Sequence, residues 1–489
     1  MKKLLHVIHN PEKDRWQNRN QEAFEELFGA GSGRYPERAK SAFTLRAPEF
    51  SGGSGVPFAA YIHPNNPDTG AYGGMSFVLF PIPDGPALLA MVVGTQGLSP
   101  DEEVLGRPGH SRKVKAICAW LNKKYGQGKM VAWAKEDPVR TDLDIPNHIK
   151  QSFHLYHDAF KRYGKVIYGF FAPQEDQKMT EEALKAFLDL LLEERGQGLL
   201  KGSQKDGETI REAYFSHLMA PVNENEVLDL LRKKRFVILQ GPPGTGKTRM
   251  ARNIVERFYD HHGTTVQFHP NTTYENVIGG LAPLQSDEGL GFRFAPQKGF
   301  LMKAAEIAAQ DPTRSYLLHI DEINRADLSK VLGEALYLLE AQEVRSRQLE
   351  LPYDFGSPFG NRLTLPQNLH IIGTMNSADR SIAIVDIAVR RRFAFVKMWP
   401  QMAVVQKYGC PLMIQAYREL LSLFIEQASD DALELLPGHS YFLESNEEVA
   451  AKALQVTLVP LLEEYIAQGY VAGFADSVRA YIQWVNSLR

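Results

Sequence analysis

The pattern of hydrophobic positions separates the chain into regions of different kinds. From about residue 223 to about residue 400, amphipathic segments alternate with short apolar runs at 236–239, 316–320 and 369–375 and with a more polar strand-like segment at 264–269. Apolar runs of this length are typical of strands buried on both faces, and their alternation with helices favours a parallel, doubly wound sheet. After residue 400, apolar residues recur at helical spacing over 413–427, 447–459 and 476–488, which predicts an all-helical segment.

The first part of the chain has a different pattern. Its apolar runs are bounded by Pro, Gly, Asn or Asp and lie at 58–63, 74–82 and 87–94. Asp84-Gly85, between the second and third runs, suits a hairpin turn. We therefore expect an N-terminal α+β domain built on an antiparallel sheet.

Two short segments join these regions. Residues 179–195 have the spacing of an amphipathic helix that Thr180 could cap, and the Gly-, Ser- and Lys-rich residues 196–207 are typical of a linker. The expected organisation is an α+β domain at 1–175, a helix and linker at 176–222, an α/β core at 223–400 and a helical segment at 401–489.

A glycine-rich loop follows the apolar run at 236–239, and a helical segment follows the loop. The glycines let backbone N–H groups point at phosphate oxygens, the lysine neutralises the β- and γ-phosphates, and the threonine hydroxyl suits Mg²⁺. The order of strand, loop and helix favours a nucleotide-binding loop over a chance glycine cluster. The loop residues are Gly241, Pro242, Pro243, Gly244, Thr245, Gly246, Lys247 and Thr248.

Two later apolar runs end in polar side chains. The run at 316–320 ends in Asp321 and Glu322, and the run at 369–375 ends in Asn376. After a phosphate-binding loop, Asp321 is expected to hold Mg²⁺ and Glu322 to act as general base for an attacking water. The Asn376 amide is suited to orienting that water. The sequence therefore predicts a Mg²⁺-dependent nucleoside triphosphate phosphohydrolase.

Three adjacent arginines, Arg390, Arg391 and Arg392, follow this stretch. A single arginine there is often a solvated cation, but the cluster suits an arginine finger that reaches the γ-phosphate of a neighbouring subunit. Arg391 is the preferred candidate, with Arg390 and Arg392 as alternatives.

Composition limits the remaining possibilities. The chain has 489 residues, 44% hydrophobic and 23% charged, which is ordinary for a globular protein of several domains. A formal net charge of -3 gives no whole-chain argument for nucleic acid, so DNA contacts would need a local patch. No apolar run is long enough to span a membrane, and two distant cysteines fit reduced thiols; we expect a cytoplasmic protein.

The chain from about residue 223 onward resembles the McrB branch of AAA+ proteins, the motor subunits of McrBC restriction systems. The resemblance is carried by Asp321-Glu-Ile-Asn-Arg-Ala and by Met375-Asn-Ser-Ala-Asp379-Arg380-Ser. It implies sheet order 5-1-4-3-2, an α-helical lid, a GTP-driven ring, by analogy a hexamer, and a McrC-type nuclease partner. It also implies that Asp379 and Arg380 couple the water-positioning site to the subunit interface. His439 stands where many AAA+ lids place an arginine; because a histidine is mostly neutral at pH 7, a structural role is equally open.

The first domain has a fainter resemblance to the DNA-reading domain of some McrB proteins, which binds DNA with modified cytosine and flips the base. Its matching positions include Gly73, Gly74, Gly94, Gln96 and Gly97. A basic cluster follows at 107–129, in which a solvated helix face and nucleic-acid contact are both open readings. The candidate DNA contacts are Arg112, Lys113, Lys115, Lys123, Lys124, Tyr61 and Trp120.

Together these features predict a McrB-like AAA+ GTPase that forms a ring and powers DNA translocation for restriction by a partner nuclease. Two alternatives remain: an ATP-driven remodelling factor of the MoxR type that acts on protein, and a nucleotide-gated sensor with slow turnover. No residue motif distinguishes GTP from ATP, so GTP is implied by the resemblance alone.

Overall fold

The computed structural model describes residues 1–29, 31, 33–48, 55–285, 292–340, 347–378 and 386–488. It forms two compact units. The N-terminal unit contains Met1–Met219 with Ile425–Ser429, and the C-terminal unit contains Ala220–Phe424 with Asp430–Arg489.

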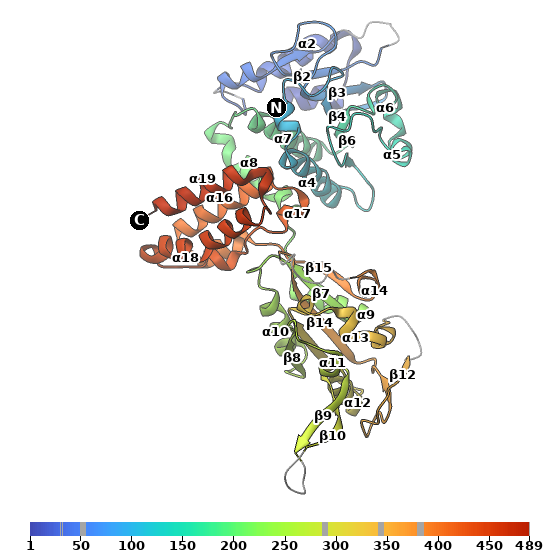
Figure 1. Cartoon of the computed structure of the whole chain (residues 1–489). Coiled ribbons are helices and arrows are strands. Elements are labelled where there is room, and N and C mark those ends of the chain that lie inside the picture. The colour runs from blue at the N-terminus through green and yellow to red at the C-terminus, as the bar shows by residue number, and fades with distance from the viewer. Residues whose placement is uncertain are drawn as a thin grey trace. The chain divides into compact units, whose positions relative to one another are not determined.

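The N-terminal unit is built on a six-stranded antiparallel sheet of order β1-β2-β3-β4-β6-β5 (Figure 1). The predicted antiparallel sheet is therefore confirmed. Its strands are β1 (Thr44–Arg46), β2 (Ala59–Ile62), β3 (Met75–Ile82), β4 (Gly85–Val93), β5 (Ala132–Ala134) and β6 (Ile167–Phe171).

Helices cover both faces of this sheet, because its strands are apolar on both sides. Tyr61 and Phe77 belong to the core beneath α1 (Lys2–His9), α2 (Trp16–Glu26), α4 (Pro108–Tyr125) and α7 (Gln177–Glu194). Their strand neighbours Ala60 and Val78 face a second core, beneath α5 (Asn147–Ser152) and α6 (His157–Tyr163). A short helix, α3 (Glu102–Leu105), precedes α4.

The glycines of the fainter resemblance have a structural explanation at the end of this sheet. Gly94 donates to Gly74 O, and a Cβ on Gly94 would lie 2.2 Å from Tyr72 O. A Cβ on Gly73 would lie 2.3 Å from Ser99 O. These positions allow backbones to approach closely, so the glycines by themselves do not indicate a DNA pocket.

Two expectations for the joining segment are wrong. Helix α7 begins at Gln177, and its N-cap is Asp176, which accepts from the Lys178 amide, whereas Thr180 is buried inside the helix. Most of the expected linker is helical, because α8 (Lys201–Phe215) begins at Lys201 and buries Ile210. Gly207 indicated flexibility in the sequence, but it is buried in α8, where a Cβ would lie 2.2 Å from the Leu199 side chain.

The C-terminal unit contains a parallel five-stranded sheet, which confirms the predicted α/β core. Its order is β15-β7-β14-β11-β8, which reads 5-1-4-3-2 when these strands are renumbered along the chain. The strands are β7 (Phe236–Gly241), β8 (Gly263–Gln267), β11 (Tyr316–Asp321), β14 (Leu369–Asn376) and β15 (Ala394–Lys397).

Helices lie against both faces of the parallel sheet (Figure 1). Val237 and Leu239 of β7 pack with α9 (Glu224–Lys234) and α10 (Lys247–Phe258). Phe236 and Ile238 face the opposite core, which includes α12 (Phe300–Gln310) and α13 (Leu328–Leu332). The remaining short elements are α11 (Tyr274–Val277), α14 (Ile387–Arg390) and the two-stranded sheets β9 (Gly279–Gln285) with β10 (Phe292–Lys298) and β12 (Gln348–Glu350) with β13 (Arg362–Thr364).

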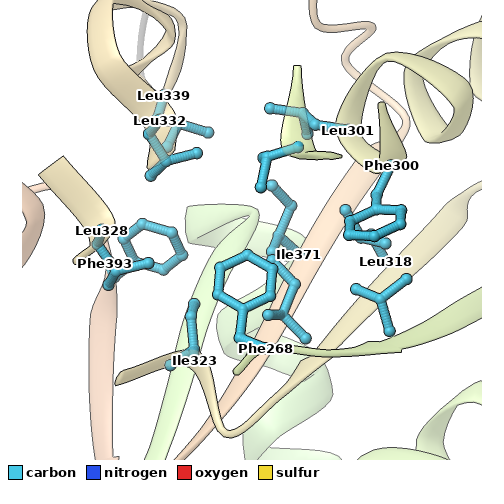
Figure 2. A pocket seen from close by; sticks show the side chains of 13 residues that line it. Phe268, Phe300, Leu301, Leu318, Ile323, Leu328, Leu332, Leu339, Ile371 and Phe393 are labelled. Carbon is cyan, nitrogen blue, oxygen red and sulfur yellow. The ribbon is translucent and has the colours of Figure 1, made fainter. Parts of the chain in front are cut away.

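A small apolar cavity lies in the core that contains Phe236 and Ile238. Figure 2 shows Phe268, Ile323 and Phe393 among the side chains around it. Its volume of about 10 Å³ is no more than one water molecule needs, and its lining is apolar. It is therefore a packing gap between the sheet and its helices and not a ligand site.

The chain after residue 400 is helical. Its helices are α15 (Met402–Tyr408), α16 (Pro411–Gln427), α17 (Asp430–Leu433), α18 (Glu447–Ala467) and α19 (Ala475–Ser487). None of the helices in the described part of the chain combines the length and the apolar composition that a membrane span requires.

Candidate nucleotide site

The glycine-rich loop joins the carboxyl end of β7 to the N-terminus of α10. Gly244 and Gly246 have φ angles of +80° and +81°, which side chains with a Cβ rarely adopt. A Cβ on Gly241 would lie 2.2 Å from Met398 O. The Thr245 hydroxyl donates to Pro242 O at 3.0 Å and closes the turn. The loop therefore has the curled backbone that phosphate binding needs.

Lys247 is folded into this loop. Its ammonium donates to Gly241 O at 3.0 Å and to Pro242 O at 2.8 Å, and the residue is only 7% exposed. Burial lowers the pKa of Lys247 to about 8, although Glu322 and Asp321 act in the opposite direction. A phosphate anion here would compensate the buried charge, which suits the expected role.

Asp321 ends β11, and two hydroxyls hold its carboxylate. Thr248 of α10 donates to Asp321 Oδ1 at 2.8 Å, and Thr374 of β14 donates to the same oxygen. A hydroxyl beside a carboxylate oxygen is a donor set that Mg²⁺ prefers, so Thr248 and Asp321 fit the expected metal. Sequence reasoning missed Thr374; the available signal was its place two residues before Asn376, on the same face of the strand.

Glu322 and Asn376 meet at the ends of adjacent strands. The Asn376 amide nitrogen lies 3.0 Å and 3.3 Å from the two carboxylate oxygens of Glu322. Glu322 has a left-handed backbone, with φ +52°, and its amide donates to the Thr374 hydroxyl at 3.2 Å. Strained conformations of this kind persist where the surroundings fix them, and they are frequent at functional sites. Arg325, which the sequence did not single out, places Nε 3.5 Å from Glu322 Oε2.

The three arginines have different environments. Arg390 lies over the Phe395 ring at 5.3 Å. Arg392 donates to Ala388 O at 2.8 Å and lies 3.8 Å from a Glu340 oxygen, with its side chain 8% exposed. Arg391 is exposed, and the described residues give it no side-chain partner. Only Arg391 therefore combines exposure with an unengaged guanidinium.

The segment before α14 is described only in part. Asp386 caps the helix by accepting from the Val389 amide at 2.9 Å. Asp379 and Arg380, which the resemblance assigned to coupling, lie outside the described residues.

The helical segment contacts the glycine-rich loop within the C-terminal unit. Gly438 donates to Pro243 O at 2.9 Å, and Ser440 donates to Gly244 O at 3.1 Å. His439, between them, accepts from the Gln401 amide at 3.3 Å through Nδ1. Burial lowers the pKa of His439, and Arg249 lowers it further, so the ring is neutral at pH 7. These contacts give His439 a structural place beside the loop.

Two buried histidines of the sheet were also missed by sequence reasoning. His319 lies on β11 and His370 on β14. Burial lowers the pKa of each to about 4, against the attraction of Asp321 in the case of His319. Both rings are therefore neutral at pH 7.

The structure corrects four of the candidate DNA contacts. Tyr61 is 0% exposed beneath α2, and Trp120 is 5% exposed, because both fill the core of the N-terminal unit. Lys113 is 2% exposed and pairs with Glu194, whose pKa falls to about 2 despite its burial. Arg112 is also buried and donates to Ile425 O at 2.7 Å within the same unit. These four side chains are engaged in the interior.

The other three candidates remain at the surface. Lys115 pairs with Glu136, and Lys124 pairs with Glu182. Lys123 is exposed.

Comparison with known proteins agrees with this geometry. Residues 236–393 match the family model of the AAA domain of the dynein-related subfamily. A parallel sheet with a phosphate-binding loop and adjacent acids at its carboxyl edge thus defines an AAA+ nucleotide-binding protein and nucleoside triphosphatase.

Two relatives show which family of AAA+ proteins this chain resembles. The chain is 30% identical over 375 residues to the "Type IV methyl-directed restriction enzyme EcoKMcrB subunit" of Escherichia coli, covering 71% of this chain and 78% of that protein. It is 28% identical over 193 residues to the "Type II restriction enzyme BsuMI component YdiS" of Bacillus subtilis, covering 32% of this chain and 55% of that protein. The chain belongs to the McrB family of restriction-system subunits.

Proposed function

We propose that the chain is a Mg²⁺-dependent GTPase that assembles into a ring, by analogy a hexamer, and powers DNA translocation for a restriction system. The observation that supports the chemistry best is the meeting of Thr248, Asp321, Glu322 and Asn376 at one edge of the sheet. GTP, the ring and the DNA are inferred from membership of the McrB family.

Each residue of the site has a proposed role. Lys247 and the N–H groups of the loop bind the β- and γ-phosphates. Thr248 and Asp321 would hold Mg²⁺, which would neutralise charge on the phosphate oxygens. Glu322 accepts a proton from the attacking water, and the Asn376 amide orients that water against the γ-phosphate. The contact of the Asn376 amide with both Glu322 oxygens supports the proposal that the two side chains act on one water.

We propose Arg391 as a finger acting in trans. Because Arg390 and Arg392 are engaged with neighbouring groups of their own subunit, Arg391 is the candidate best able to reach another nucleotide site. Activity would then require assembly, since a single subunit lacks the charge that its neighbour supplies. Asp379 and Arg380 remain proposed coupling residues on the strength of the family signature alone.

We further propose that the N-terminal unit selects DNA, including DNA with modified cytosine, and that a McrC-type nuclease subunit cuts it. The names of the two relatives, both restriction enzyme components, support this role.

The decisive experiment measures hydrolysis of GTP and ATP by the full chain, with and without DNA and the product of a neighbouring nuclease gene. GTP turnover raised by that nuclease is the expected result. ATP turnover indifferent to both additions would instead favour a protein-remodelling ATPase.

Replacing Glu322 with Gln tests the motor itself. We expect turnover to fall by about 10²–10⁴-fold, with nucleotide binding retained, because the general base is lost while the phosphate contacts remain. Glu334→Gln is a matched control, since Glu334 accepts from the Tyr274 hydroxyl away from the site. If Glu322→Gln kept its DNA-cleavage output with the nuclease, the protein would be a nucleotide-gated sensor.

A further inference from the structure

His319 lies in the interior of the parallel sheet, on the same strand face as Asp321. Alternate residues of a strand project to the same side, so the two side chains, two residues apart on β11, are neighbours. His319 is 0% exposed. Its Nδ1 lies 3.2 Å from the hydroxyl of Thr265, its register partner on β8. Its Nε2 lies 3.8 Å from Asp321 Oδ1.

The second ring nitrogen of His319 has no hydrogen-bond partner among the described residues. A buried polar atom without a partner is unfavourable, and an apolar side chain would fill this position without that cost. The imidazole is therefore better suited to a state in which Nε2 gains a partner.

Electrostatics indicates which nitrogen carries the proton. If the Thr265 hydroxyl donates to Nδ1, then Nε2 carries the hydrogen and directs it toward the Asp321 carboxylate. The opposite tautomer would direct a lone pair toward that anion, which is repulsive. The N–H···carboxylate arrangement is accordingly favoured, at a distance that one small side-chain rotation can close.

We propose that His319 is a positioning residue for the metal–nucleotide site, whose Nε2–H holds the Asp321 carboxylate in the orientation that Mg²⁺ binding requires. The proposal rests on the proposed function, because it takes Asp321 as part of the metal site. Asp321 Oδ1 already accepts from Thr248 and Thr374. His319 restrains the same oxygen from inside the sheet, as residues behind a metal ligand commonly do.

The test measures metal affinity in the full chain, with Mn²⁺ as a spectroscopic probe in the presence of GTP. His319→Asn places no donor at the Nε2 position, whereas the longer His319→Gln does. We expect His319→Asn to weaken Mn²⁺ binding by about tenfold, and His319→Gln to recover most of that loss. Nucleotide affinity in EDTA should not change, because no phosphate contact is removed.

Two further variants test whether the change in Mn²⁺ affinity is only a consequence of disturbed packing. His370→Asn removes another buried histidine, on β14, which pairs with Tyr259 at 2.5 Å away from the metal site. It should leave Mn²⁺ affinity unchanged. Thr265 is at an exposed position, so Thr265→Val should fold. It should weaken Mn²⁺ binding by a few fold, because without the Thr265 hydroxyl either ring nitrogen of His319 can carry the hydrogen.

The outcomes are distinguishable. Wild-type Mn²⁺ affinity in His319→Asn, or an equal loss in His370→Asn, would overturn the positioning role. If Asp321→Asn weakens Mn²⁺ binding and His319→Asn does not, only this inference is wrong. If Asp321→Asn also binds Mn²⁺ as the wild type does, the proposed metal site fails, and the inference fails with it. If His319→Asn does not fold, the test rests on Thr265→Val and His319→Gln. Unchanged Mn²⁺ affinity in Thr265→Val together with a full loss of Mn²⁺ binding in His319→Gln would overturn the positioning role.

Discussion

At the scale of single residues, the carboxyl edge of the parallel sheet concentrates groups that are costly to keep in the interior. Lys247 is buried with its ammonium on two main-chain oxygens, and Glu322 has a left-handed backbone. Both features are unfavourable by themselves, and phosphates and water at this edge would compensate them.

The lowered pKa of Lys247 leads to a prediction about pH. In the free protein its pKa is about 8, below the value of 10.5 for an exposed lysine. Between these values the unfolded chain binds more protons than the folded one, so the free energy of unfolding should rise with pH from about 8 to about 10. Phosphates raise the pKa again, so GTP binding at pH 8.5 should take up a proton.

Calorimetry in buffers of different ionisation enthalpy would measure this uptake. Lys247→Met should abolish both the proton uptake and this part of the pH dependence. Proton release on binding would show that the buried ammonium is not the group that meets the phosphates.

At the scale of elements, short helices carry side chains whose function depends on neighbours. Helix α14 is only four residues long, Asp386 caps it, and the arginines at and beyond its end have three different environments. Burial and pairing thus distinguish residues that are equivalent in the sequence.

We predict that Arg391 acts on another subunit. Arg391→Ala alone should lose about 10³-fold or more in turnover, and Glu322→Gln should lose about 10²–10⁴-fold. Mixing the two variants should restore part of the activity, because a Glu322→Gln subunit can supply its arginine to an intact site. Arg392→Ala is the matched control. Mixing Arg392→Ala with Glu322→Gln should not restore activity. Absence of recovery in mixtures that do assemble would place the arginine in its own site.

Helix α8, which contains residues 201–207 of the expected linker, permits a test of how firmly this part of the chain is packed. Ile210 is 6% exposed, whereas its neighbour Thr209 is exposed. Ile210→Ala should lower the free energy of unfolding by about 2–4 kcal/mol, through lost burial and the cavity left behind. Thr209→Ala should change it by less than about 0.5 kcal/mol. Chemical denaturation would measure both, and equal small effects would show that α8 is not packed through Ile210.

At the scale of the whole molecule, two units with separate cores fit a division of labour between target selection and nucleotide hydrolysis. The net charge of -3 cannot attract DNA by itself, so any binding must depend on local lysines.

We predict that the exposed lysines of α4 contribute to DNA affinity and that the buried candidate side chains, Tyr61 among them, do not. Lys123→Glu with Lys124→Glu should weaken DNA binding by the full chain and reduce the salt slope by about one per lost contact. Tyr61→Phe should leave affinity unchanged, because its hydroxyl is buried. Binding titrations at several salt concentrations would measure these effects; a large loss in Tyr61→Phe would contradict the assignment of Tyr61 to the core.

Features that depend on local order along the chain could be predicted from the sequence. The loop at 241–248, the acids after β11 and Asn376 after β14 each follow a buried strand, and parallel strands bring their carboxyl ends to one edge. Their convergence could therefore be predicted from motif and periodicity alone, and so could the two kinds of sheet. The chemical roles of these residues remain predictions.

The accessibility of polar and aromatic side chains, in contrast, depends on long-range packing. Lys113 and Trp120 are part of an apparently basic helix, yet both lie inside the N-terminal unit. Much of a glycine-rich segment belongs to the helix α8, and His319, which no sequence pattern singled out, lies next to Asp321. Such outcomes depend on which surfaces meet across long sequence separations, and burial, pairing and orphaned atoms are properties of those contacts, which local patterns do not encode.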